Sequence, residues 1–222
     1  VPEAAPIMAE LDRRGWTLSQ VWLTHHHPDH VQGLAELLTR FPAEVIGAKA
    51  DAHRLPSLDR EVVEGDRIEL GALTAQVLDV SGHTVGHIAL HVPKAKVAFT
   101  ADSLMALGCG RLFDGTPAQM WESLQKLAAL PADTTICSGH EYTAANAKFA
   151  LTVDPQNPAL ISRAKDIDSA RAKGQPTVPS PLSLELETNP FLRPGDPAIR
   201  ATLGMPDATD TEVFTEIRKR KN

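Results

Sequence analysis

The feature that most constrains this chain is the octapeptide LTHHHPDH at residues 23–30, which crowds four histidines beside an aspartate. Imidazoles at short, fixed spacing are typical of a metal site. The preceding segment, WTLSQVWLT, predicts a strand over residues 16–24, and VQGLAELLTRF predicts a helix over residues 31–41. The chain is therefore expected to hold metal ligands at the carboxyl end of a strand, where α/β proteins place their chemistry.

Composition excludes several classes of protein. The 222 residues, with 42% hydrophobic and 23% charged side chains, are typical of a globular chain and not of a disordered one. A net charge of −6 argues against a nucleic-acid-binding surface. No apolar run is long enough to cross a bilayer and no leader opens the chain, so we expect a cytoplasmic protein with no membrane partner. We also expect a monomer. Cys109 and Cys137 are interpreted as two reduced thiols, with a single bridge between them as the alternative.

Periodicity along the chain predicts a mixed α/β fold. Apolar residues at helical spacing precede Gly15, which is well placed to end a helix. Short strands over residues 61–100 favour antiparallel hairpins, and Thr116 with Pro117 predicts the start of a further helix. After Tyr142 the pattern is almost wholly helical. We expect a β-rich domain at residues 1–140 and a smaller helical domain at residues 141–222.

The spacing within the octapeptide suits two metal ions. In an extended segment alternate side chains point the same way, so His25 and His27 can converge on one ion. Pro28 then turns the chain, which lets Asp29 and His30 face a second position. One short loop can therefore serve two ions.

Further ligands follow other predicted strands. His83 lies in SGHTVGH, Asp102 in FTADS and His140 in SGHEY. With Asp102 bridging, His25, His27 and His83 would hold one ion, and Asp29, His30 and His140 the other. Nitrogen and carboxylate ligands without thiolate suit zinc, iron or manganese. Two such ions about 3.5–4 Å apart activate a bridging hydroxide, which predicts a hydrolytic centre.

The strings THHHPDH, GHTVGH, FTADS and GHEYT, in this order, resemble the metallo-β-lactamase superfamily. GCGRLFDGT, GHEYTAANAKFA and NPFLR resemble glyoxalase II, the hydroxyacylglutathione hydrolases. The resemblance implies an αββα sandwich with a dinuclear site, followed by a helical domain that binds glutathione. It also implies hydrolysis of S-D-lactoylglutathione to D-lactate and glutathione, a step of methylglyoxal detoxification, by a hydroxide held between two divalent ions. Zinc is the expected metal, with iron or a mixed zinc and iron pair as the alternative.

The resemblance also carries over site residues. Asp29 and Asp102 are the predicted catalytic carboxylates as well as ligands. The predicted contacts to the glutathione thioester come from a central segment, from residues around the last ligand and from the C-terminus: Arg111, Leu112, Phe113, His140, Glu141, Tyr142, Arg218 and Lys221. Without the likeness, Tyr142 packed at a domain junction would be an equal interpretation, and a solvated tail would be the preferred interpretation of the basic C-terminus. His26 and His87 remain unassigned, with packing or support of a ligand as the two options.

Three departures from the family pattern stand beside these expectations. Family chains begin with an additional hairpin and strand, which leads us to expect an exposed sheet edge if these strands are absent. Ala101 occupies a usual glycine position, and Phe113 stands where many relatives have tyrosine. Two alternatives stay open: a persulfide dioxygenase of the same superfamily with one iron, and a truncated, non-catalytic binder of glutathione conjugates.

Overall fold

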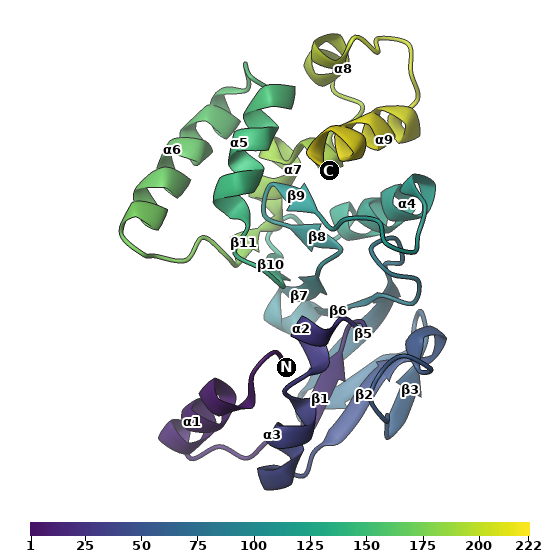
Figure 1. The fold of residues 1–222 in the computed structure, drawn as a ribbon, viewed down its shortest axis with the longest axis vertical. Helices are drawn as coiled ribbons and strands as arrows, with labels where there is room; N and C mark the ends of the chain where they lie inside the picture. The colour runs from purple at the N-terminus through teal and green to yellow at the C-terminus, as the bar shows by residue number, and fades with distance from the viewer.

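The structure, a computed structural model, describes residues 1–222. Its centre is a pair of β-sheets that pack face to face (Figure 1). The larger sheet has the order β11-β10-β7-β6-β5-β4. Its strands are β4 (Arg67–Leu70), β5 (Leu73–Asp79), β6 (Ile88–Val92), β7 (Val97–Ala101), β10 (Thr135–Ser138) and β11 (Ser180–Pro181). Strands β4 to β7 form consecutive antiparallel pairs, which confirms the predicted hairpins over most of residues 61–100.

The smaller sheet is all parallel and has the order β1-β2-β3. Its strands are β1 (Gln20–Leu23), β2 (Glu44–Ala48) and β3 (Arg60–Val62). The hairpin prediction is wrong for β3, because this strand pairs with β2 in the parallel sense. Its Val62 is 1% exposed and lies in the core between the two sheets. Pairing with β2 buries the Val62 side chain. The short-range spacing of residues in the sequence does not show which strand is the partner.

The layers follow from alternation along the strands. On β6, Ile88 and Leu90 belong to the apolar cluster between the sheets, whereas Ala89 belongs to the cluster under the helices. Helices α1 (Ala4–Arg14) and α3 (Leu34–Arg40) cover the outer face of the smaller sheet. Helices α4 (Pro117–Ala128) and α9 (Asp210–Lys221) cover the outer face of the larger one. The result is the predicted αββα sandwich, and each fully buried leucine or isoleucine stabilises it by about 1.5–3 kcal/mol.

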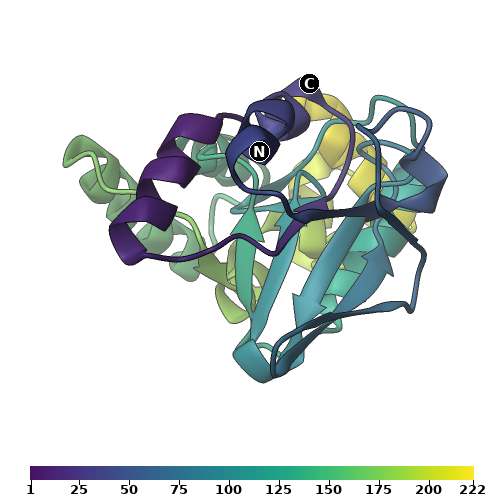
Figure 2. The same cartoon turned by 90° about the horizontal axis from the view of Figure 1, so that it is seen from below.

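Local signals set several helix ends. Gly15 ends α1 with φ at 62°, a left-handed conformation that glycine adopts without steric cost. The Thr116 hydroxyl accepts a hydrogen bond from the Gln119 amide at 3.2 Å, and the Gln119 side chain accepts one from the Thr116 amide at 2.9 Å. Both predicted ends are confirmed. Seen from below, α1 (purple) lies to the left of the strands and the C-terminal helices (yellow) lie behind them (Figure 2).

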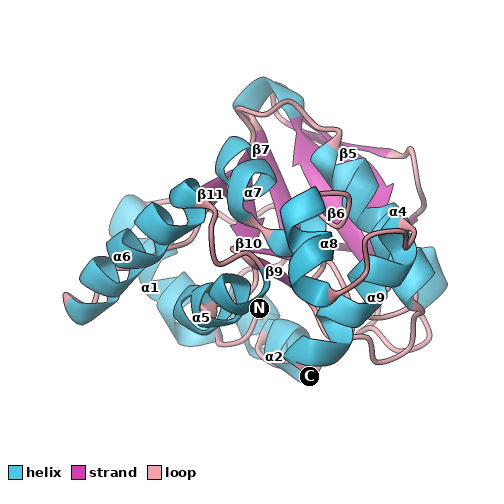
Figure 3. Ribbon diagram, turned by 90° about the horizontal axis from the view of Figure 1, so that it is seen from above, coloured by secondary structure: helices cyan, strands magenta, loops and turns pink.

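The chain after β10 is mainly helical, as predicted. Its helices are α5 (Thr143–Val153), α6 (Pro158–Ala172), α7 (Leu182–Thr188), α8 (Pro197–Leu203) and α9. Figure 3 shows α5 and α6 side by side. The proline-rich connector before α7 does more than link helices, because its last residues form β11 at the edge of the larger sheet. Pro181 is tolerated there because an edge strand leaves one row of backbone donors unpaired.

Two short elements complete the site's surroundings. Helix α2 (Pro28–Val31) follows β1, and the hairpin β8 (Leu104–Met105) with β9 (Gly108–Cys109) follows β7. Cys109 and Cys137 are both free thiols, so the two-thiol interpretation is confirmed. No helix of the structure combines the length and the apolar character needed to span a membrane.

Candidate metal centre

All seven predicted ligands meet at one edge of the sandwich. The segment from His25 to His30 leaves β1, His83 lies between β5 and β6, and Asp102 and His140 follow β7 and β10. Side chains separated by more than a hundred residues thereby lie in contact: Nε2 of His30 and Nε2 of His140 are 3.2 Å apart. The ends of neighbouring strands supply every member of the cluster, as the sequence predicts.

The cluster contains two triads of ligand atoms that share no member: a first triad, His25, His27 and His83, and a second triad, Asp29, His30 and His140. Within each triad, the atoms lie within 4.8 Å of one another. A third group, His25, His30 and Asp102, meets the same limit and joins the two. Asp102 lies between them, with its Oδ2 atom 3.5 Å from Nε2 of His83 and 3.3 Å from Nε2 of His140. This is the arrangement required of a carboxylate shared by two cations.

Glycines allow the close approach of these groups. A Cβ atom on Gly139 would lie 2.3 Å from Oδ1 of Asp102 and 2.8 Å from the His30 ring. One on Gly110 would lie 2.1 Å from the Asp102 carbonyl oxygen. Ala101 adopts φ of 42°, in the left-handed region, where a Cβ costs about 1–2 kcal/mol. This strain gives the physical reason for the family's usual glycine at that position.

Burial sets the protonation of the cluster. It lowers the pKa of the His25, His27 and His83 imidazoles, and the neighbouring His87 lowers that of His25 further. These rings are therefore neutral near pH 7, the form that binds a metal. Burial also acts to raise the pKa of Asp102, but the nearby His30 outweighs it and the net pKa is lowered. The carboxylate is thus ionised.

The donor set fits divalent cations. Two buried polar atoms at its centre, Nε2 of His25 and Oδ1 of Asp102, have no hydrogen-bond partner in the protein. Buried polar atoms are rarely left unpartnered, so a cation that accepts both lone pairs explains them. Nδ1 of His83 donates to the Arg111 carbonyl at 2.7 Å, which directs Nε2 of the ring toward the cluster. The nitrogen and carboxylate donors suit zinc or iron, and no thiolate takes part.

A cleft of about 710 Å³ opens above the two triads. Its lining includes ligands and most of the predicted substrate residues, namely His27, Asp29, His83, Asp102, Arg111, Phe113, His140, Tyr142, Arg218 and Lys221. Phe113, which is 63% exposed, meets the His83 ring edge-on at 5.3 Å. Tyr142 stacks on His140 at 4.7 Å. Two aromatic walls therefore stand on either side of the metal positions.

The two basic residues at the C-terminus have different surroundings. Arg218 is 4% exposed, donates to the Cys109 carbonyl at 2.8 Å and lies over the Phe191 ring at 5.1 Å. Lys221 lies over Phe149 and donates to a backbone carbonyl of α5 at 3.1 Å. Arg218 is therefore held in place by the protein itself, whereas Lys221 is the more accessible cation.

Two predicted substrate residues do not line the cleft. Glu141 turns toward the connector after α6, where its carboxylate accepts a hydrogen bond from the Thr177 amide at 2.7 Å. Leu112 packs against the core beneath the larger sheet. Adjacency in sequence to Arg111 or His140 does not bring a side chain into the cleft, because neighbours on an extended segment point to opposite sides.

Sequence reasoning left His26 and His87 open between packing and support of a ligand, and it missed Asp51. His26 is paired with Asp51, which is completely buried, through Nδ1 at 2.9 Å. His87 is completely buried and stacks on His25 at 4.5 Å. Asp51 carries no local signal in the sequence, because its partner lies 25 residues away. His26 thus supports the ligand loop, whereas for His87 the packing interpretation describes what the structure shows.

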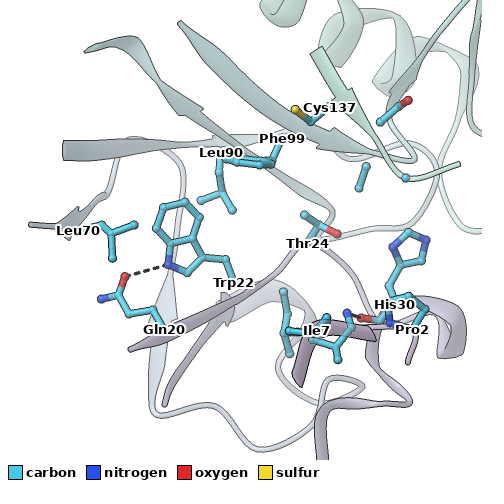
Figure 4. Close-up of a pocket in the computed structure, with 15 residues that line it drawn as sticks. Pro2, Ile7, Gln20, Trp22, Thr24, His30, Leu70, Leu90, Phe99 and Cys137 are labelled. Atoms are coloured by element: carbon cyan, nitrogen blue, oxygen red, sulfur yellow. Dashed lines mark hydrogen bonds between the residues drawn. The ribbon is translucent and has the colours of Figure 1, made fainter. Parts of the chain in front are cut away.

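A second cavity, of about 670 Å³, lies behind His30 between β1 and the larger sheet (Figure 4). It is mostly apolar, and Trp22 meets Phe99 edge-on in it at 6.2 Å. The Trp22 indole donates to the Gln20 side chain at 3.0 Å. His30 is the only member of the metal cluster among the residues that line it. This cavity lacks the groups for catalysis, so we assign the chemistry to the cleft.

Known proteins resemble this chain over its whole length. The profile of the metallo-beta-lactamase superfamily matches residues 1–140, and the profile of the hydroxyacylglutathione hydrolase C-terminus matches residues 141–222. The hydroxyacylglutathione hydrolase of Ruegeria pomeroyi is 69% identical over 221 residues, which cover 100% of this chain and 87% of the relative. That of Roseobacter denitrificans is 63% identical over 222 residues, with the same coverage. The crystal structure of ETHE1 from Myxococcus xanthus aligns with a TM-score of 0.65 at 24% sequence identity. The alignment covers 100% of this chain and 78% of that one, and it supports the fold.

Two facing sheets with a histidine and aspartate cluster at their strand ends define a member of the metallo-β-lactamase superfamily. Within this superfamily, the chain belongs to the hydroxyacylglutathione hydrolases, which are thioester hydrolases.

Proposed function

We propose that this chain hydrolyses S-D-lactoylglutathione to D-lactate and glutathione with two divalent metal ions in the cleft, and so serves in methylglyoxal detoxification. The observation that carries the proposal is the pair of ligand triads with Asp102 between them. The seven side chains supply enough donors for two ions only if Asp102 serves both. Zinc is the proposed metal, with iron or a mixed pair as the alternative.

When bound, the two ions would lower the pKa of a water molecule toward neutrality and polarise the thioester carbonyl. His25, His27 and His83 would hold one ion, and Asp29, His30 and His140 the other, with Asp102 shared. Asp29 is 57% exposed and lies at the mouth of the cleft, where it can also accept a hydrogen bond from the attacking water. The thiol of glutathione has a pKa of about 8.5, so its thiolate leaves without a strong general acid.

Glutathione carries two carboxylates, and the cleft offers cations to receive them. Arg111 lies on its lining, and Lys221 lies at the end of α9 on the same lining. Phe113 and Tyr142 flank the space between these cations and the metal positions. We propose that the acyl group lies over the ions while the peptide runs between the aromatic rings toward Lys221.

The proposal also covers the oligomeric state and the division of the chain into two units. The chain would act as a monomer, with a metal-binding unit at residues 1–140 and a helical unit at residues 141–222. The two profile matches, at residues 1–140 and 141–222, support the division, and β11 and α9 pack the second unit against the first. Limited proteolysis with a cut near residue 141, and a sedimentation mass equal to one chain, are the expected results.

Thioester hydrolysis with metal counting tests the function. The purified protein should consume S-D-lactoylglutathione, followed by loss of thioester absorbance, and should contain two metal ions per chain. Asp102→Asn should lower kcat/KM by at least about 100-fold, since even residues that only support metal ligands give 10- to 100-fold losses. Asp133→Asn, which removes an exposed carboxylate paired with Lys96, is the matched control and should change nothing.

The same measurements separate the alternatives. A single iron with oxygen uptake and no hydrolysis would replace the proposal with a persulfide dioxygenase. Tight binding of glutathione conjugates with no turnover would replace it with a non-catalytic binder. Curated relatives at 69% and 63% identity bear the name hydroxyacylglutathione hydrolase and support the hydrolase over both.

A further inference from the structure

A chain of four polar residues runs beneath the cleft without lining it: His26, Asp51, Arg54 and Asp114. Nδ1 of His26 donates to Asp51 at 2.9 Å, and Nε of Arg54 donates to Asp51 at 2.8 Å. Nη1 of Arg54 donates to Asp114 at 2.7 Å. Nη2 of Arg54 donates to the Val85 carbonyl at 2.8 Å. Each donor group of this guanidinium therefore has its own partner.

The network reaches both loops that carry ligands of the first triad, and a third loop, that of Asp114, which carries no ligand. His26 lies between the ligands His25 and His27. Val85 lies in the loop of His83, two residues after that ligand. Asp114 follows Phe113, whose amide donates to the His83 carbonyl at 3.1 Å. Arg54 thus binds the loop of His83 directly through Val85, and reaches the loop of His25 and His27 through Asp51.

Asp51 is the buried centre of this arrangement. Its side chain is 0% exposed, and an unpaired carboxylate there would be costly. A Cβ on Gly86 would lie 3.0 Å from the Asp51 Cβ, so the loop of His83 also packs directly against this residue. Close packing of this kind transmits a displacement of the aspartate to the loop.

The second triad has no share in this network. None of the four residues forms a hydrogen bond with Asp29, His30 or His140. These three ligands come from α2 and from the segment after β10. The hydrogen bonds of the network therefore reach residues beside the first triad and none of the second, although Asp29 and His30 lie on the same octapeptide as His25 and His27.

We infer that Arg54 and Asp51 are positioning residues for one metal position only, the one formed by His25, His27 and His83. The inference rests on the proposed two-metal function. Arg54 acts through three loops at once, because its planar guanidinium holds three acceptors at fixed angles. A lysine keeps the charge but cannot reach all three partners.

Zinc titration of the full-length protein tests this asymmetry. Arg54→Lys should weaken one of the two zinc equivalents by about 10- to 100-fold, the usual effect of removing support from a metal ligand, and leave the other unchanged. Arg40→Lys is the matched control. Arg40 also forms two hydrogen bonds, with Asp12 at 2.8 and 2.6 Å, but lies far from the site on the surface.

Ligand variants identify which position is affected. In a His140→Ala background the first triad is the only intact one, and Arg54→Lys should weaken the remaining zinc. In a His83→Ala background the second triad is intact, and Arg54→Lys should have no effect. Asp114→Asn removes the charge from one partner of Arg54 and should also weaken zinc binding at the first triad, by a smaller factor. This second variant keeps the inference testable if Arg54→Lys fails to fold.

The zinc titrations in these two backgrounds decide whether the network supports only the first metal position. Equal weakening in both backgrounds, or no weakening in either, would overturn the inference. Selective weakening in the His140→Ala background supports it. If the parent protein binds only one zinc ion, the proposed two-metal function fails, while the effect of Arg54→Lys on that ion still decides whether the network positions its ligands.

Discussion

Two buried polar clusters lie beside the β8–β9 hairpin, and they differ in how many of their polar atoms have a partner. The Glu185 cluster (Arg163, Ser180, Glu185 and Asn189) is satisfied by the protein alone. The Glu185 carboxylate accepts hydrogen bonds from Arg163, from Ser180 at 2.7 Å, from the Leu107 amide at 2.8 Å and from Asn189 at 3.1 Å. Its role is to attach the helical part of the chain to the hairpin.

The metal cluster, in contrast, leaves buried atoms without partners. Nε2 of His25 and Oδ1 of Asp102 are examples, although both residues are buried to the same degree as those around Glu185. A buried polar group costs free energy unless it is paired, so only one cluster stabilises the fold by itself. The comparison teaches that burial and charge do not distinguish these two clusters, whereas unpartnered atoms among side chains able to bind metal do.

The largest effect on stability is expected at the complete cluster. Glu185→Gln leaves the buried Arg163 without its carboxylate and should lower the free energy of unfolding by about 3–5 kcal/mol. Urea unfolding of the metal-free protein measures this. Glu187→Gln, at an exposed position on the same helix, is the control and should be neutral. Loss of zinc binding in folded Glu185→Gln would show that the two clusters are not independent.

Metal removal should lower the stability of the protein through the metal cluster alone. At a free zinc concentration 100 times the dissociation constant, binding stabilises the folded state by about 2.7 kcal/mol, so a chelator should lower the melting temperature. The same difference should persist in Glu185→Gln and vanish in Asp102→Ala. A melting temperature insensitive to chelator would contradict a metal site made of these residues.

A single methyl group added at Gly139 should weaken zinc binding at the metal cluster. Gly139→Ala places a Cβ 2.3 Å from the Asp102 carboxylate, so the bridging group must move and zinc affinity should fall by about 10- to 100-fold. Gly195→Ala is the control, because its Cβ would meet only the Asp210 side chain, at 3.2 Å. Calorimetric titration reads both variants, and equal zinc affinity in the two would refute the close approach at Gly139.

The smallest effect is expected at the rim of the cleft. Phe113→Tyr adds a hydroxyl to an exposed ring beside the metal positions, where one new hydrogen bond to the substrate is worth about 0.5–1.5 kcal/mol. KM for the thioester should fall by about 2- to 10-fold, with kcat and zinc content unchanged. A change in kcat instead would place this ring in the chemical step.

Local patterns accounted for much of the fold and most of the site. Alternation predicted β1 and the hairpins of the larger sheet, and the end of α1 at Gly15 followed from glycine's conformational freedom. His25, His27, Asp29 and His30 were recognisable because residues one to five apart on one loop lie close together whatever the rest of the chain does. Strand-end positions then brought in His83, Asp102 and His140.

The tertiary structure alone decided how these groups are held. Asp51 and Arg54 support the ligand loops through partners up to 60 residues away, and β11 joins the larger sheet from a segment that reads as a connector. Glu141 stands next to a ligand yet turns toward Thr177. The sequence determined which side chains can bind metal, because that depends on residue type and short spacing. Packing determined which of them are supported, paired or turned away, because that free energy comes from contacts between distant segments.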